Sequence, residues 1–289
     1  MVIYMPSCYL HNMLYKEVIK QNNIIFRNKN LIKIGAQGPD IFFYYHRIFM
    51  YRNKKYMEYG EFLHKNDIEN TFINMIKYAQ KIENEELKND LFSYIFGYGL
   101  HYILDRNFHP YINSFIEKNS VLNTKNHLIF EANLDVFLAA KNNEKIEFNK
   151  LLKIPKKDVK KVSVLFNNVN NNLKKNTYFK AYKEMILIRN LTKNGTLIKK
   201  IIKIFKIRNE ILESALYPSH FEDNIDILNV SNKKYYNDLS YYQMFDICLK
   251  EANIFYDILK NYFDEKVNDN YESLINFIDN KDYNGNFCR

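Results

Sequence analysis

Three residues that can bind a metal ion lie in the segment HYILDRNFHP, residues 101–110: His101, Asp105 and His109. They are spaced four residues apart, and four residues advance a helix by about 400°. Their side chains would therefore share one face of a helix, within about 80° of arc. The residues around them are mostly apolar, so this stripe is expected to be buried, where unpartnered His and Asp side chains are costly. A metal ion is a partner that would offset that cost.

A second stripe follows in the segment 123–141, where His127 and Glu131 are four residues apart and Asp135 continues the spacing. Imidazole nitrogens and carboxylate oxygens are zinc ligands, and three protein ligands with a water make a hydrolytic site. The two stripes hold more ligands than one such zinc takes, which indicates two or more ions. We interpret Asp135 as a carboxylate that orients a histidine or lies on the surface. Further candidates could complete the set: His11, Asp40 and His64.

The elements that would position these residues are predicted to be helices. Hydrophobic periodicity and the scarcity of Gly and Pro favour long helices, and no strand-like alternation is present. The predicted helices cover residues 7–20, 66–80, 86–110, 123–141, 156–175, 178–190, 194–216, 239–264 and 269–279. The fold class is therefore all-α, with residues 1–289 forming one domain.

Two local features of this prediction concern the candidate ligands. Pro110 is expected to end the helix that carries His101. Gly35, Gly38 and Pro39 break the preceding helix, so Asp40 is expected in or beside a turn. Residues 50–66, which include His64, are expected to be irregular.

Composition places the chain among soluble globular proteins, with 47% apolar and 26% charged residues. The net charge of +9 suits an anionic partner, namely a phospholipid surface, a nucleic acid or a phosphate ester, or simply reflects a Lys-rich surface. No apolar run reaches the roughly 18 residues of a transmembrane helix. No signal peptide is visible and the three cysteines form no CxxC pair, so a cytoplasmic location is expected. Secretion by a non-classical route stays open.

The order and spacing of these residues resemble the zinc-dependent phospholipase C family, which shares a superfamily with the single-strand-specific nucleases. The resemblance covers roughly residues 6–140. It rests on the segments MPSCYLH, IGAQGPDIFFYY, FLH, GYGLHYILDRNFHPY and HLIFEANLD. The resemblance implies a multi-helix domain whose metal ligands lie in residues 1–140, followed by a divergent helical half in residues 141–289.

The resemblance also implies a role for each candidate residue. One zinc ion would be held by His64, His101 and Asp105. A second zinc ion would be held by His109, His127 and Glu131. A third site would use His11, with Asp105 as a bridging ligand, and its occupancy is left open. Asp40 would act as the general base or orient the attacking water.

The function implied by the resemblance is hydrolysis of glycerophospholipids to diacylglycerol and a phosphorylated headgroup by metal-activated water. Four aromatic residues are expected to line a mouth for acyl chains: Phe42, Phe43, Tyr44 and Tyr45. A peripheral contact with a membrane would accompany this activity. The alternatives are a nuclease or phosphomonoesterase with the same metals, and a metal-bound interaction protein without activity. The headgroup and the oligomeric state are left open.

Overall fold

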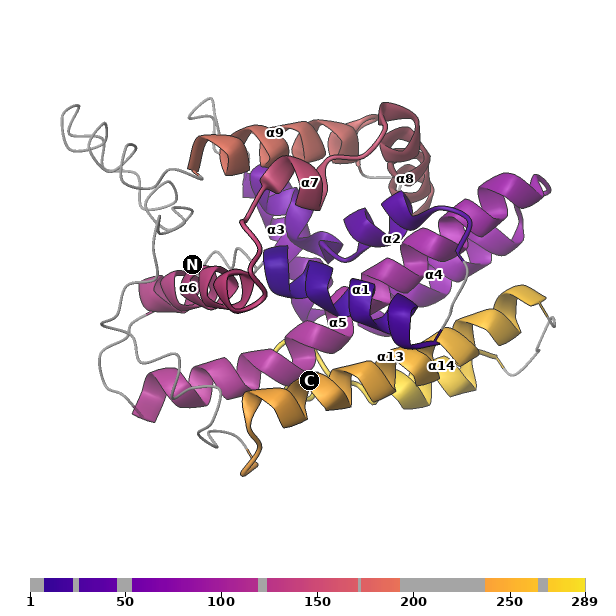
Figure 1. The fold of residues 1–289 in the computed structure, drawn as a ribbon. Coiled ribbons are helices and arrows are strands. Elements are labelled where there is room, and N and C mark those ends of the chain that lie inside the picture. Colours follow the sequence, from indigo (N-terminus) through magenta and orange to yellow (C-terminus); the bar gives the residue numbers. More distant parts are fainter. Residues whose placement is uncertain are drawn as a thin grey trace.

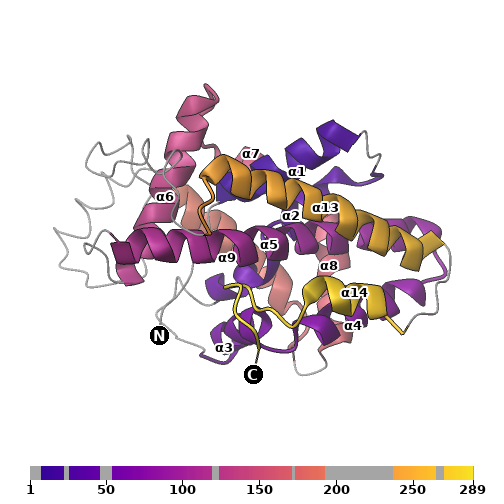
Figure 2. The ribbon, with the colours of Figure 1, turned by 90° about the horizontal axis from the view of Figure 1, so that it is seen from below.

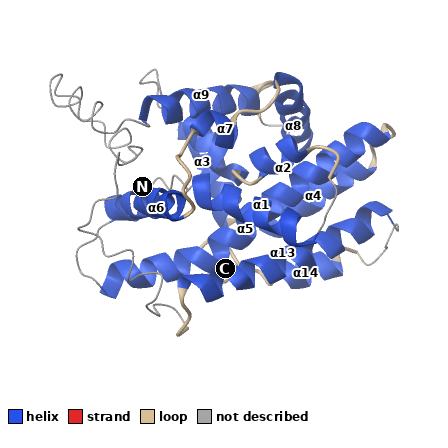
Figure 3. Ribbon diagram, viewed as in Figure 1, coloured by secondary structure: helices blue, strands red, loops and turns tan. Residues whose placement is uncertain are grey.

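The described part of the chain is helical. The computed structural model describes residues 8–22, 26–45, 54–118, 124–170, 173–192, 237–264 and 270–288. These ranges contain no strand, and an isolated β-bridge joins Lys281 and Phe287 (Figure 3). The prediction of an all-α fold is confirmed. The helix expected at 194–216 lies outside the described residues.

Helix α5 (Glu85–Lys118) is the central element of the fold (Figure 1). It is 34 residues long and is packed against α1 (Cys8–Asn22), α2 (Lys29–Gly35), α4 (Ile68–Gln80) and α13 (Tyr241–Asp264). Its middle turns are apolar on every side, and a helix with that pattern is stable only when it is enclosed by other elements. The stripe of candidate ligands therefore lies inside the molecule.

The remaining helices cover two sides of α5. The 3-10 helix η1 (Gly38–Tyr44) and α3 (Lys54–Lys65) pack on each other, and α14 (Glu272–Ile278) packs against α4 and α13. The other helices are α6 (Thr124–Lys141), α7 (Phe148–Leu152), α8 (Lys156–Val169) and α9 (Thr177–Thr192). Figure 1 shows α7, α8 and α9 on one side of α5, with α13 and α14 on the opposite side, and Figure 2 shows α13 running along α5.

Helices α2 and α5 approach each other closely at Gly97. A Cβ atom at this position would lie 2.3 Å from the carbonyl oxygen of Ile32, so no other residue fits without moving a helix. Glycine in a helix costs about 1 kcal/mol relative to alanine. That cost is offset here by the contact, which brings the segment after α2, including Asp40, next to the ligand stripe of α5.

Three of the sequence expectations about elements are wrong. Residues 54–65 form helix α3 rather than an irregular segment, because one face of this helix packs on η1. Helix α5 continues through Pro110 to Lys118, and the buried side chains of Tyr111 and Ile112 hold the turn beyond the proline. Helix α8 ends at Val169, well before residue 175.

Asp135 of α6 fixes the start of α1. Its side chain is fully buried, and its two oxygens accept hydrogen bonds from the backbone N–H groups of Tyr9 (2.9 Å) and Leu10 (3.0 Å). The first N–H groups of a helix have no partner within the helix, and a carboxylate there also interacts favourably with the helix dipole. Asp135 is therefore not a surface residue, and it anchors the helix that carries His11.

Candidate metal centre

Four of the candidate residues converge at one buried point. Asp40 comes from η1, His64 from α3, and His101 and Asp105 from α5. Each offers one ligand atom, and these four atoms lie within 4.8 Å of one another. All four side chains are buried. Residues separated by as many as 65 positions in the chain thus form one cluster, which we call the metal cluster.

The distances within the metal cluster fit a zinc ion. Nε2 of His64 lies 3.0 Å from Oδ1 of Asp40, and Nε2 of His101 lies 3.2 Å from Oδ2 of both Asp40 and Asp105. Ligands at the usual 2.0–2.1 Å from a tetrahedral zinc are about 3.3 Å from each other. The observed spacing therefore suits ligands that share one ion.

The orientation of the histidine rings also suits metal binding. His64, His101 and His109 each place ring Nδ1 against a backbone carbonyl oxygen. The Nδ1 to oxygen distances are 2.6 Å to Gly60, 3.3 Å to Ala36 and 2.8 Å to Tyr283. A carbonyl oxygen only accepts hydrogen bonds, so Nδ1 carries a proton in each ring. The Nε2 atom of each ring then faces carboxylate oxygens either with a lone pair, which needs a metal ion, or with a second proton.

Three polar atoms of the metal cluster are buried without a hydrogen bond in the described part of the chain. They are Oδ2 of Asp40, Nε2 of His64 and Nε2 of His101. Buried polar atoms normally have partners, and their absence carries a free energy cost. A metal ion bound by these atoms would remove that cost, so the donor set and its surroundings fit zinc.

His11 joins the metal cluster through Asp105. Nε2 of His11 lies 3.2 Å from Oδ1 of Asp105, and its ring stacks on that of His101 with centroids 4.4 Å apart. The two oxygens of Asp105 thus face different histidines. That arrangement suits a carboxylate shared by two ions, the role that the resemblance implies for Asp105, although occupancy of a site at His11 stays a prediction.

The second predicted ligand set is partly visible. His109 of α5 and Glu131 of α6 are both buried, and Nε2 of His109 lies 3.6 Å from Oε1 of Glu131. His127 belongs to α6, but its side chain lies outside the described residues. The structure therefore brings together two of the three side chains of this set.

Burial and neighbouring charges set the protonation of the two carboxyl groups differently. Burial raises the pKa of Asp40 to about 6, although the nearby His64 opposes the shift. Burial alone would also raise the pKa of Asp105, but the adjacent His101 and His109 outweigh it and hold the pKa below its ordinary value. Asp105 is therefore ionised at neutral pH, which is the form that binds zinc.

Burial and neighbouring charges also shift the pKa values of the histidines in different directions. Burial lowers the pKa of His101 well below its ordinary value, and the attraction of Asp105 offsets only part of this. Burial thus favours the neutral ring of His101, which is the form that can donate a lone pair to a metal. For His109, burial is outweighed by Asp105 and Glu131, which raise its pKa to about 9. For His64, Asp40 likewise outweighs burial and raises the pKa.

Gly38 makes room for the metal cluster. Its φ of +50° is a left-handed conformation that favours glycine, and a Cβ atom there would lie 2.0 Å from the His101 ring. The sequence showed Gly38 only as a helix breaker before Asp40. It gave no signal for Tyr283, whose carbonyl oxygen holds His109.

The expected aromatic mouth is not present. Phe42, Phe43, Tyr44 and Tyr45 are each at most 5% exposed and belong to the protein core. Phe42, for example, makes edge-to-face contacts with the rings of Tyr59 and Phe166. A short run of apolar residues in a sequence does not show whether the side chains line a cavity or pack in the core. Here they pack in the core.

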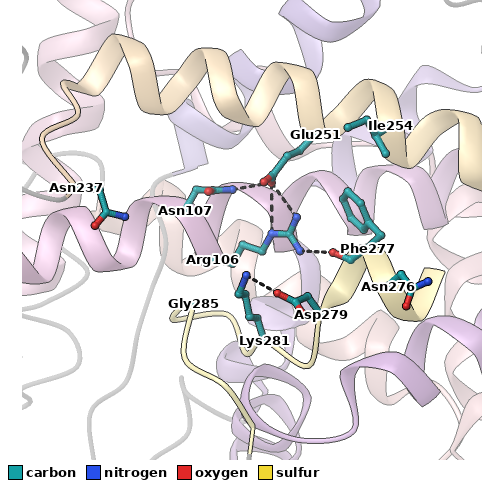
Figure 4. Close-up of a pocket in the computed structure, with 10 residues that line it drawn as sticks. All are labelled: Arg106, Asn107, Asn237, Glu251, Ile254, Asn276, Phe277, Asp279, Lys281 and Gly285. Atoms are coloured by element: carbon teal, nitrogen blue, oxygen red, sulfur yellow. Dashed lines mark hydrogen bonds and ion pairs between the residues drawn. The ribbon is translucent and has the colours of Figure 1, made fainter. Parts of the chain in front are cut away.

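A separate pocket of about 460 Å³ lies between α5, α13, α14 and the residues after α14 (Figure 4). Its wall contains no candidate metal ligand. Its main charged groups are paired, because Glu251 accepts hydrogen bonds from Arg106 (2.9 Å) and Asn107 (2.8 Å), and Lys281 lies 2.7 Å from Asp279. We therefore place the chemistry at the metal cluster.

Comparison with known proteins agrees with this centre. The zinc dependent phospholipase C family matches residues 9–184, which include every candidate ligand. The match covers more than half of the chain, so the chain belongs to this family. No curated protein and no solved structure matches the chain. In the described part of the chain no helix has the length and apolarity needed to cross a bilayer.

Proposed function

We propose that the protein is a phospholipase C that hydrolyses glycerophospholipids to diacylglycerol and a phosphorylated headgroup. The oxygen of a water molecule bonds to phosphorus, the bond from phosphorus to the glycerol oxygen breaks, and that oxygen takes up a proton. The observation that carries this proposal is the buried metal cluster of Asp40, His64, His101 and Asp105, in a chain of the zinc dependent phospholipase C family.

The chain would hold zinc with His64, His101 and Asp105, and a second ion with His109, His127 and Glu131. A third site at His11 belongs to the same proposal. Bound zinc would supply Lewis-acid polarisation of the phosphodiester oxygens and lower the pKa of water. The carbonyls of Gly60 and Ala36 would keep the His64 and His101 rings oriented throughout.

Asp40 is the proposed general base. Its pKa of about 6 lies closer to neutrality than that of an ordinary aspartate, so it could take a proton from water and release it again near pH 7. Both of its oxygens also face histidine Nε2 atoms. We therefore propose that Asp40 binds the metal ion in addition to handling the proton.

The decisive experiment compares three substrates: mixed phospholipid vesicles, single-stranded DNA and a phosphomonoester. We expect diacylglycerol and phosphorylated headgroup, detected by mass spectrometry, to form from the vesicles. The rate should vanish after chelation of zinc and return when zinc is added back. Cleavage of DNA or of the monoester without lipid cleavage would replace this proposal with the nuclease or phosphomonoesterase alternative.

A pair of matched variants ties any activity to the metal cluster. Asp105→Asn removes the shared carboxylate charge and should abolish hydrolysis. Asp257→Asn makes the same change at an exposed position of α13 and should leave the rate unchanged. No cleavage of any substrate by a zinc-loaded protein would favour the non-catalytic alternative.

The positive net charge supports a further part of the proposal, namely contact with an anionic phospholipid surface. Binding to vesicles should then weaken as salt increases, because the attraction is screened. The cytoplasmic location expected from the sequence stays a prediction.

A further inference from the structure

The loop of residues 279–288, which follows α14, lies against the metal cluster. It is closed on itself by backbone hydrogen bonds from Asp282 to Asn286 (2.8 Å) and from Cys288 to Asn280 (2.7 Å). One oxygen of Asp282 also accepts hydrogen bonds from the N–H groups of Asn284 and Asn286, both at 2.8 Å. The 279–288 loop is therefore a folded unit, although its sequence has no helical or strand pattern.

Tyr283 is the residue through which the loop reaches the candidate ligands. Its carbonyl oxygen accepts the Nδ1 proton of His109 (2.8 Å), and its N–H donates to the carbonyl oxygen of His64 (3.1 Å). Its side chain is 1% exposed, and its ring lies 4.8 Å from that of His64 and 5.6 Å from that of His101. One loop residue thus contacts three candidate ligands from two helices.

Pro110 and Gly285 explain how the loop reaches this position. Proline has no N–H group, so the carbonyl oxygen of Arg106 lacks its usual partner four residues later in α5. Gly285 packs against α5 beside this oxygen. A Cβ atom on Gly285 would lie 2.6 Å from the oxygen and 3.0 Å from Cγ of Pro110. Its φ of +72° is also one that favours glycine. Figure 4 shows the loop at Gly285 passing beside α5 at Arg106.

We propose that the 279–288 loop is a positioning element of the metal centre, and that Tyr283 fixes His109 and His64 for zinc. Histidine ligands commonly donate their second ring N–H to a carbonyl, which sets the tautomer and the ring direction. For His64 and His101 that carbonyl is local to the cluster elements, in α3 and just after α2. For His109 it is supplied by the loop, which lies outside the family match of residues 9–184.

This inference rests on the metal centre of the proposed function, but its readouts are zinc affinity and amide exchange rather than hydrolysis. A protein that binds zinc and cleaves no lipid could still confirm it. If the protein cleaves lipid but changes in the loop leave zinc affinity unaltered, the loop inference is overturned while the proposed function stands.

The test variant is Gly285→Ala, which pushes the loop away from α5 without changing any polar group of the metal cluster. We expect zinc affinity, measured by competition with a chromophoric chelator, to fall by about 10–100-fold, the usual effect of losing a partner of a metal ligand. A loss of stability in the metal-free protein with unchanged zinc affinity would show a purely structural loop and overturn the proposal.

A variant in the same loop serves as the control. Phe287→Ser removes a side chain that is 66% exposed, and should leave zinc affinity unchanged. If Phe287→Ser lost as much zinc affinity as Gly285→Ala, the assigned role of the Tyr283 backbone would be wrong.

A measurement on the unaltered protein keeps the test valid if Gly285→Ala fails to fold. Coupling between sites is reciprocal, so a loop that strengthens zinc binding must itself be held by zinc. Hydrogen exchange of the amides in residues 280–288 should slow on zinc addition more than exchange in α8, which supplies no candidate ligand. Equal exchange of the loop with and without zinc would overturn the proposal.

Discussion

At the scale of single residues, the metal cluster is arranged by backbone carbonyls as much as by side chains. The backbone carbonyls of Ala36, Gly60 and Tyr283 each accept a hydrogen bond from Nδ1 of one histidine. The remaining nitrogen must then face the carboxylates. A set of histidines and aspartates without such partners could turn its rings or protonate them, and would bind a metal less tightly.

For Asp40, the structure adds contacts with two histidines to the role expected from the sequence. We predict that Asp40→Asn lowers the hydrolysis rate by about 10²–10⁴-fold, the usual contribution of a general base. Zinc content should also fall, since the neutral amide replaces a carboxylate that faces two histidines. The measurements are the rate on phospholipid vesicles and the zinc content per chain by elemental analysis.

Asp246→Asn is the matched control, because it makes the same change at an exposed position of α13. A fully zinc-loaded but inactive Asp40→Asn protein would assign Asp40 to proton transfer alone. An active variant with normal zinc content would remove Asp40 from the site.

The sequence predicted most members of the cluster but not their supports. His101, Asp105 and His109 were visible because helical spacing places them on one face. His64 and Asp40 were candidates by residue type, and the resemblance implied their roles. Tyr283 acts through its backbone, 174 positions from His109, so its side chain type carries no information about the contact. Gly38 was visible only as a turn residue, since its contact with His101 depends on tertiary structure.

At the scale of elements, helix α1 depends on a carboxylate from another helix. We predict that Asp135→Ala lowers the free energy of unfolding by about 1–2 kcal/mol or more, because the N–H groups of Tyr9 and Leu10 lose their acceptors. Urea denaturation of the metal-free protein would measure this change without a contribution from zinc.

Glu144→Ala provides the comparison for Asp135. Glu144 also contacts α1, through the hydroxyl of Tyr9 at 3.1 Å, but it is about half exposed. Its loss should change stability by less than about 0.5 kcal/mol. Equal effects of the two substitutions would mean that the buried cap contributes no more than a surface contact.

The contact of α5 with α13 and α14 is fixed by a partly buried ion pair between Arg106 and Glu251. Glu251 accepts hydrogen bonds from Arg106 and Asn107, and Arg106 also donates to the carbonyl oxygen of Phe277 (2.9 Å). We predict that Glu251→Ala lowers the free energy of unfolding by about 2–3 kcal/mol, because a largely buried guanidinium loses its counter-charge. Thermal and urea denaturation would test this.

Glu86→Ala is the control for this pair. Glu86 lies 3.1 Å from Arg27, but both side chains are more than half exposed. Exposed pairs contribute little, so the change should stay below about 0.5 kcal/mol. A small effect of Glu251→Ala, similar to that of Glu86→Ala, would contradict the importance of the partly buried pair.

Helices were predicted correctly where the hydrophobic pattern extends over many residues. The prediction failed where tertiary contacts determine whether a segment is helical. The helices at 66–80, 123–141 and 239–264 correspond closely to α4, α6 and α13. Helix α3 was missed because its pattern is short and rich in Lys and Tyr, and its stability comes from η1. The continuation of α5 past Pro110 depends on buried residues beyond the proline, which local rules do not include.

At the scale of the whole molecule, zinc is expected to stabilise the fold. Without a metal ion, the buried Asp40, His64, His101 and Asp105 lack a partner that satisfies all their polar atoms. Zinc at about 1,000 times its dissociation constant would add about 4 kcal/mol. We predict that chelation lowers the melting temperature by about 5–10 °C.

Differential scanning calorimetry with and without chelator would measure this shift. Added Zn²⁺ should restore the melting temperature, whereas Mg²⁺, which prefers oxygen ligands, should not. Identical melting temperatures with chelator and with zinc would mean that the buried cluster does not bind the ion in the folded state.

The wide separation of His11, His109 and Tyr283 along the chain has a consequence for biosynthesis. Ribosomes add about 5–20 residues per second, so roughly tens of seconds separate the appearance of His11 from that of Tyr283. During this interval the early ligands have already left the exit tunnel, but His109 has no carbonyl to fix its tautomer. An ion captured by the nascent chain is held by an incomplete set and can exchange. We therefore expect the identity of the bound metal to be set only after residue 283 has been made and has docked.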